Sequence, residues 1–146
     1  MASYTRAQLA ATIDHSVLLP QLTRRDAEAA IVLGRDCGAA SCCVRPCDIR
    51  LAAGLLRGSS TLVCTVIGFP HGSHATEVKV AEAQQALSDG AVELDMVLNI
   101  GRLRNGTAED DAFVEADIAA VVAAAHAHSP PAIVKGARRS LEGNVT

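Results

Sequence analysis

The sequence contains very few aromatic residues: its 146 residues include one Tyr, two Phe and no Trp. Hydrophobic residues nevertheless make up 49% of the chain, so Ala, Val, Leu and Ile must fill nearly all of the core. Cores of this kind are typical of parallel sheets covered by helices. The composition therefore predicts a single α/β domain over residues 1–146.

Clustered positive charge and long apolar runs are also absent. The 13 Lys and Arg are scattered and the formal net charge is -3, which does not favour a nucleic-acid partner. No stretch approaches the roughly 18 apolar residues that span a bilayer, and Met1 to Arg6 lead into no secretion signal. We therefore expect a cytoplasmic protein with a small-molecule partner, no nucleic acid and no membrane.

Motifs for metals and dinucleotides are missing as well. The cysteines are odd in number and lack paired C-x-x-C spacing, which predicts reduced, buried thiols and no zinc site. The loop from Gly68 to Gly72 lacks the G-x-G-x-x-G arrangement, so no dinucleotide cofactor is expected. The five cysteines are Cys37, Cys42, Cys43, Cys47 and Cys64.

Strand-like and helix-like segments alternate along the chain. Apolar runs typical of strands begin near residues 13, 41, 62, 92 and 132. Alternation with short loops requires a parallel sheet with right-handed crossovers. Helical spacing predicts helices at 5–11, between 23 and 38, at 49–56, between 76 and 90, and at 108–126.

Particular residues indicate where these helices begin and end. Thr23, followed by Asp26, forms a shortened capping box, and Gly38 suits the end of that helix. Thr76 is predicted to cap a later helix, and residues 101–106 are predicted to form a loop.

One predicted strand has a polar face. In Glu93 to Asn99, strand alternation places Glu93, Asp95, Val97 and Asn99 on one side and three large aliphatic residues on the other. A barrel strand can point polar groups inward, whereas both faces of a doubly wound sheet are covered by helices. This favours a partial TIM (β/α)8 barrel of about four βα units plus a fifth strand. A flavodoxin-like sheet is the alternative, and strand order distinguishes the two.

Chemistry in such proteins gathers at the carboxyl ends of strands. Asp14, Asp95 and Lys135 are expected to pair with one another, because a buried carboxylate requires a cation or hydrogen-bond donors. An internal ion pair without chemistry explains the same pattern, and periodicity leaves both interpretations open. The full candidate set is Asp14, His15, Cys43, Arg45, Asp95, Asn99 and Lys135.

Five segments occur in an order that resembles the deoxyribose-phosphate aldolase family, over about residues 12 to 135. The V-I-G-F-P turn followed by T-E-V-K and then E-L-D-M-V-L-N-I-G is the most specific part of the resemblance. The segments are Ile13 to Ser16, Gly38 to Val44, Cys64 to Pro70, Thr76 to Lys79 and Glu93 to Gly101.

The resemblance implies reversible cleavage of 2-deoxyribose 5-phosphate to acetaldehyde and glyceraldehyde 3-phosphate through a lysine Schiff base, with no cofactor or metal. The iminium serves as an electron sink while a nearby acid/base moves protons. By resemblance, Asp95 and Lys135 are catalytic. Asp14, Ser16 and Cys43 line the substrate pocket.

The chain also departs from the family pattern. Leu19 stands where the family has a lysine, and the tail at residues 136–146 does not match. The segments expected for strands six to eight, with the K-T-S-T lysine that forms the Schiff base, do not occur. We therefore expect a truncated barrel that is inactive alone, with the pKa of Lys135 near the ordinary value of roughly 10. Its open strand edges favour homo-oligomers.

Two other functional interpretations stay open at this stage. One is a non-catalytic half-barrel remnant or a pseudoenzyme that binds phosphosugars. The other is a flavodoxin-like binding domain.

Overall fold

The sheet consists of five parallel strands in sequential order. A computed structural model of the chain describes residues 3–137, so the tail that departs from the family pattern lies outside the described residues from residue 138 onward. The order β1-β2-β3-β4-β5 excludes the flavodoxin-like alternative and is that of a (β/α)-barrel segment. The strands are β1 (Asp14–Val17), β2 (Ser41–Val44), β3 (Leu62–Ile67), β4 (Glu93–Val97) and β5 (Ile133–Ala137).

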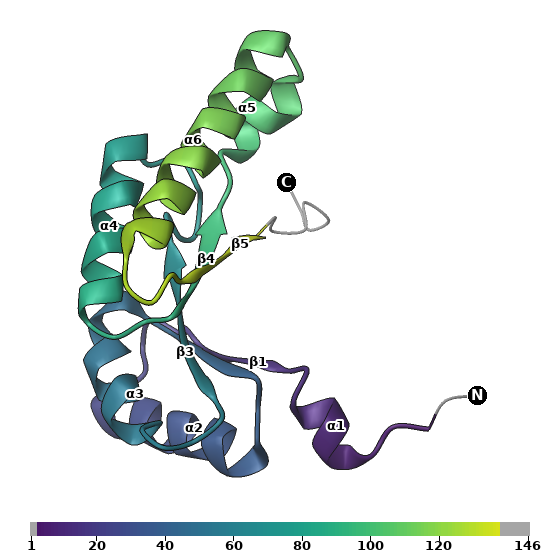
Figure 1. Cartoon of the computed structure of the whole chain (residues 1–146), viewed down its shortest axis with the longest axis vertical. Helices are drawn as coiled ribbons and strands as arrows, with labels where there is room; N and C mark the ends of the chain where they lie inside the picture. Colours follow the sequence, from purple (N-terminus) through teal and green to yellow (C-terminus); the bar gives the residue numbers. More distant parts are fainter. Residues whose placement is uncertain (1–2, 138–146) are drawn as a thin grey trace.

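The main helices α2, α3, α4 and α6 all cover the same face of this sheet (Figure 1). These four helices do not cover the other face, which corresponds to the inside of a barrel. No helix within the described residues is long and apolar enough to cross a membrane. The helices are α1 (Arg6–Ala10), α2 (Arg24–Cys37), the 3-10 turn η1 (Pro46–Asp48), α3 (Ile49–Leu55), α4 (Thr76–Ser88), α5 (Ile100–Asn105) and α6 (Ala108–Ala127).

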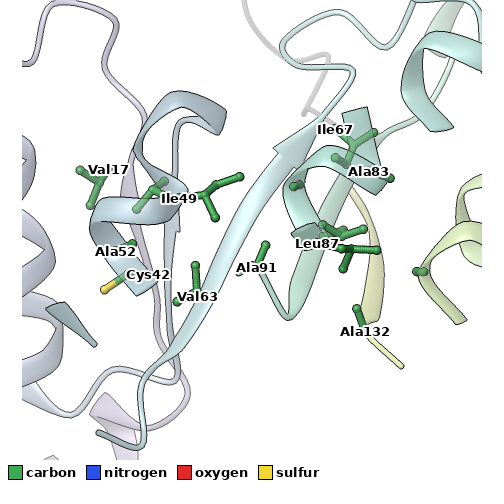
Figure 2. Close-up of a cluster of buried hydrophobic side chains, with 14 of the residues drawn as sticks. Val17, Cys42, Ile49, Ala52, Val63, Ile67, Ala83, Leu87, Ala91 and Ala132 are labelled. Carbon is green, nitrogen blue, oxygen red and sulfur yellow. The ribbon is translucent and has the colours of Figure 1, made fainter. Parts of the chain in front are cut away.

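The core lies between the helices and the outer face of the sheet. Every second strand residue points toward the helices, so that fully buried Leu94 and Met96 alternate with the polar residues of β4. Small helix residues such as Ala52 and Ala83 let the helices pack close to the strands (Figure 2). The scarcity of aromatic residues is therefore matched by close packing of aliphatic side chains.

The capping predictions were partly right. Thr23 and Asp26 form a reciprocal capping box on α2, and Gly38 ends that helix at φ 70°. The prediction for Thr76 was wrong, because Ala75 is the N-cap of α4 and the Thr76 hydroxyl donates to Asp117 on α6 instead. The Thr76 hydroxyl thus bonds a residue of another helix and does not cap its own helix.

Residues 101–106 do not form the predicted loop. The Asn99 side chain accepts a hydrogen bond from the Arg102 amide, which starts the short helix α5, and Gly106 ends it at φ 65°. Arg102 stacks on Phe113, 4.7 Å from the ring centroid, and pairs with Asp110 at 2.7 Å. Contacts with α6 therefore stabilise a helix in a segment whose composition predicted a loop.

Behind the sheet, Lys79 of α4 and Asp117 of α6 form a fully buried ion pair. Their Nζ and Oδ2 atoms are 2.5 Å apart, and both side chains are at most 1% exposed. Lys79 also donates to the carbonyl of Val97, the last residue of β4, at 3.1 Å, while Thr76 donates to the other Asp117 oxygen. These bonds tie the carboxyl end of β4 to both helices.

Replacing Lys79 alone should be strongly destabilising, because Asp117 would remain buried without a cation. We expect Lys79→Met to lower the free energy of unfolding by about 3–5 kcal/mol. The double variant Lys79→Met/Asp117→Leu should recover much of this loss, since both charges are gone. Urea denaturation measures the difference. A double variant as unstable as the single one would contradict this interpretation.

Asp110 makes part of the stability depend on pH. Hydrogen bonds from Arg102, Thr107 and Asn105 lower the pKa of Asp110 to about 2. A lowered folded-state pKa gives stability that is present above the unfolded value of about 3.9 and is lost as the pH falls toward 2. We expect wild type to be more stable than Asp110→Asn at pH 6, and the two to converge near pH 2. Urea denaturation across this range tests it, and a constant difference would contradict it.

Candidate functional site

The amine of Lys135 lies among three carboxylates on the open face of the sheet. Its Nζ atom is 3.1 Å from Asp14 Oδ2, 2.6 Å from Glu93 Oε1 and 3.2 Å from Asp95 Oδ1. Asp14 belongs to the first strand and Lys135 to the fifth, 121 residues later. The side chain of Lys135 therefore spans the sheet and brings its two outer strands together.

Parallel register explains why these residues meet. Asp95 is the direct partner of Lys135 across β4 and β5, and Glu93 lies two residues earlier on the same face of β4. On β2, the same face carries Ser41, whose hydroxyl donates to Asp14 Oδ1 at 2.6 Å, and Cys43, whose thiol lies 3.8 Å from Asp95 Oδ2. The polar alternation in β4 is thus continued by its neighbours.

The charges in this cluster shift one another's pKa values. Burial acts to lower the pKa of Lys135, but its hydrogen bonds to Glu93 and Asp14 outweigh burial and raise the value well above the ordinary one. The prediction that the pKa of Lys135 stays near 10 was therefore wrong, because three carboxylates surround its ammonium group. At neutral pH this amine is held protonated.

The two aspartates shift in opposite directions. Burial and the negative charge of Asp14 raise the pKa of Asp95, although Lys135 opposes them. Burial also acts to raise the pKa of Asp14, but hydrogen bonds from Ser41 and Lys135 lower it overall. Asp14 is thus the more firmly ionised of the two, and Asp95 is the one whose protonation changes more easily.

The cysteines divide into buried and exposed groups. Cys42, Cys43 and Cys64 are buried free thiols, whereas Cys37 and Cys47 are exposed, which corrects the expectation that they are buried. Burial, followed by the charge of Asp14, raises the pKa of Cys42 to about 11. A hydrogen bond with Cys43 and then burial raise the pKa of Cys64. The Cys42 and Cys64 thiols therefore remain protonated.

Three of the candidates have structural roles instead. His15 faces α2, where its Nε2 lies 3.1 Å from the Ala30 carbonyl, since strand alternation turns it away from Asp14. Arg45 pairs with Asp48 at 2.7 Å and donates to three carbonyls of the loop after β1. Asn99 caps α5. The structure therefore does not bring these three into contact with Lys135, as convergence of all the candidates would require.

Ser16 lies beyond the cluster on β1. It is exposed, shares its face with Asp14 and is opposite Cys43 in the register. Its proposed contact with substrate stays a prediction.

Sequence reasoning missed two members of the cluster, Ser41 and Cys64, and placed Glu93 on the polar face of β4 without counting it among the candidates. Each lies on the same face as a predicted residue, two positions away from it or opposite it in the register. Period-two alternation applied to every strand would have found them.

The same cluster offers ligand atoms for a metal ion: those of Asp14, Cys43, Cys64 and Asp95 all lie within 4.8 Å of one another.

A glycine allows the loop after β3 to approach this end of the sheet. Gly72 has φ 69°, and a Cβ atom there would clash with the backbone carbonyl of Leu98, just after β4. Close contact between the two loops therefore requires glycine at this position.

Comparison with known proteins identifies deoxyribose-phosphate aldolases among the relatives of this chain. The chain is 46% identical over 120 residues to a deoxyribose-phosphate aldolase of Clostridium perfringens, covering 82% of this chain and 52% of the relative. It is 48% identical over 118 residues to deoxyribose-phosphate aldolase 1 of Bacillus licheniformis, covering 81% and 52%. The chain thus spans about half the length of the curated relatives it matches. No family model matches it.

Solved structures agree with the sequence matches. A putative deoxyribose-phosphate aldolase from Coccidioides immitis superimposes with a TM-score of 0.82 at 34% identity, covering 93% of this chain and 51% of that one. Deoxyribose-phosphate aldolase from Aeropyrum pernix, described as having a unique tetrameric structure, gives 0.77 at 32%, covering 90% and 53%.

Removing one of the three carboxylates should release the amine of Lys135. We expect Glu93→Gln to lower the pKa of Lys135 and to speed its reductive methylation at pH 8, roughly tenfold for each unit of pKa lost. Peptide mass spectrometry measures this cleanly, because the sequence has only two lysines and Lys79 is buried. Asp36→Asn, an exposed acid beside Arg35, is the matched control. A rate unchanged by Glu93→Gln would contradict the assignment.

Proposed function

Since the chain is homologous to an N-terminal region of the deoxyribose-phosphate aldolase family, we propose that it forms the proton-transfer half of such an active site. The reaction is the reversible cleavage of 2-deoxyribose 5-phosphate to acetaldehyde and glyceraldehyde 3-phosphate, a step in deoxyribonucleotide breakdown. The observation that carries this proposal is the Lys135 amine held among Asp14, Glu93 and Asp95 on the inner face of a barrel segment.

Asp95 is the acid/base in this proposal. Its carboxylate contacts Lys135 through Oδ1 and faces the Cys43 thiol through Oδ2, so it can exchange a proton with a substrate lying over the open face. A raised pKa brings it closer to neutral pH, where a general acid/base is most effective. Lys135 holds Asp95 in place and supplies positive charge beside it. Asp14, Ser16 and Cys43 line the substrate pocket.

The Schiff-base nucleophile has to come from elsewhere. Of the two lysines in the sequence, Lys79 is fully buried against Asp117, and Lys135 is held as an ammonium ion by its carboxylates. An imine forms only from the neutral amine. The K-T-S-T segment that carries the family's nucleophile does not occur in these 146 residues. We therefore propose that this chain by itself does not turn over.

We also expect the chain to associate with other strands and to be located in the cytoplasm. The outer edges of β1 and β5 favour association with other strands, including those of a second copy. A cytoplasmic location stays an expectation from the sequence.

A chimaera tests the function directly. Residues 12–135 replace the homologous segment of the Clostridium perfringens relative, so that the relative supplies the remaining part of the barrel and its nucleophile. We expect measurable cleavage of 2-deoxyribose 5-phosphate, followed through glyceraldehyde 3-phosphate release. Asp95→Asn in the chimaera should lower kcat by about 100-fold or more, as expected when a general acid/base is lost. Asp36→Asn should leave kcat unchanged.

The isolated chain provides the second half of this test. Borohydride treatment with 2-deoxyribose 5-phosphate should leave no adduct on Lys135. An adduct would show that the chain has its own nucleophile and would overturn the proposal of inactivity. A folded chimaera without activity would instead favour a non-catalytic half-barrel remnant or a phosphosugar-binding pseudoenzyme.

A further inference from the structure

We propose that the inner face of the sheet contains a binding site for one thiophilic divalent cation of the zinc and cadmium class. The site lies beside Lys135 and draws one ligand from each of four consecutive strands. Its ligands are Asp14 of β1, Cys43 of β2, Cys64 of β3 and Asp95 of β4.

The ligand atoms are already close to the required arrangement. All four lie within 4.8 Å of one another. Zinc bonds of about 2.3 Å to sulfur and 2.0–2.2 Å to oxygen imply tetrahedral edges of roughly 3.3–3.8 Å. Cys43 Sγ and Asp95 Oδ2 are 3.8 Å apart, and Cys43 lies directly opposite Cys64 in the register. Small side-chain rotations would therefore complete a tetrahedral set without moving the strands.

Charge at this position favours a further cation. Within residues 3–137, the cluster joins three carboxylates to a single ammonium group. Asp95 turns Oδ1 toward Lys135 and leaves Oδ2 facing the Cys43 thiol, so a metal can bind Oδ2 without displacing the ammonium. Asp14 would exchange its hydrogen bond with Ser41 for the metal. The negative surplus thus points toward the two thiols.

The chemistry of the ligands selects the kind of ion. Two buried sulfurs and two carboxylate oxygens suit a soft or borderline d10 ion, whereas calcium and magnesium require oxygen ligands alone. Binding forms two metal–sulfur bonds as each thiol releases its proton to solvent. The divalent ion thus replaces two protons, the charge of the cluster stays the same, and no oxidant or reductant takes part.

The spacing of the ligands in the sequence does not indicate this site. Cys43 and Cys64 are 21 positions apart and belong to no C-x-x-C pair, so spacing argued against a metal. Parallel pairing of β2 with β3 places them side by side, and the carboxylates come from the strands on either side. The site shares Asp14, Cys43 and Asp95 with the proposed active site, and metal binding there does not require lyase activity.

Cadmium binding tests the proposal on the reduced 146-residue chain. Sulfur-to-cadmium charge-transfer absorption reports the number of thiolates bound during titration with Cd²⁺ alone, and Zn²⁺ should compete for the same site. We expect one Cd²⁺ per chain, bound by two thiolates. Cys43→Ser and Cys64→Ser should each weaken binding by at least about 100-fold, because loss even of outer-shell partners costs 10–100-fold.

Matched variants separate this site from the exposed thiols. The double variant Cys37→Ser/Cys47→Ser should keep the full signal, since both side chains lie outside the cluster. Asp95→Asn should keep the thiolates yet weaken binding, which provides a readout that does not depend on cysteine replacement. Absence of two-thiolate absorption, or a signal lost with Cys37 and Cys47 rather than with Cys43 and Cys64, would overturn the proposal.

Discussion

The inner face of the sheet depends on one ammonium group placed among three carboxylates. Without Lys135, Asp14, Glu93 and Asp95 would lie close together as like charges, which is unfavourable in a partly buried setting. The cation lets them coexist and, because it comes from the fifth strand, links that strand to the first. The same contacts keep the amine protonated, so the interaction that organises the site also limits its chemistry.

Both lysines of the chain are used as internal counterions. Lys79 serves Asp117 behind the sheet and Lys135 serves the acids in front of it, and β4 lies between them. Lys79 contacts the Val97 carbonyl, two residues beyond Asp95, so the outer ion pair supports the strand that presents the inner one. This arrangement is suited to holding and moving protons, and neither of the two lysines presents a free amine.

The two faces of the sheet differ in polarity because successive side chains of each strand point to opposite faces. Leu94 and Met96 pack under small helix residues, and Glu93 and Asp95 point the other way into a polar layer shared by all five strands. In that layer, thiols lie directly beside carboxylates. The proposed proton transfer by Asp95 and the proposed binding of a thiophilic cation therefore require the same carboxylate, so a bound ion would prevent the proton transfer.

The sequence alone determined the order of strands and helices, the capping box at Thr23, the polar face of β4 and the resemblance to an aldolase family. All of these depend on periodicity or on short sequence segments, and both can be recognised in the sequence because they reflect local backbone geometry. Tertiary structure decided what joins distant residues: the reach of Lys135 to Asp14 and its raised pKa, the bond from Thr76 to Asp117, the helix α5 held by Asp110, and the meeting of Cys43 with Cys64. Such contacts depend on register and on burial, and neither is set by the residues next to them in the chain.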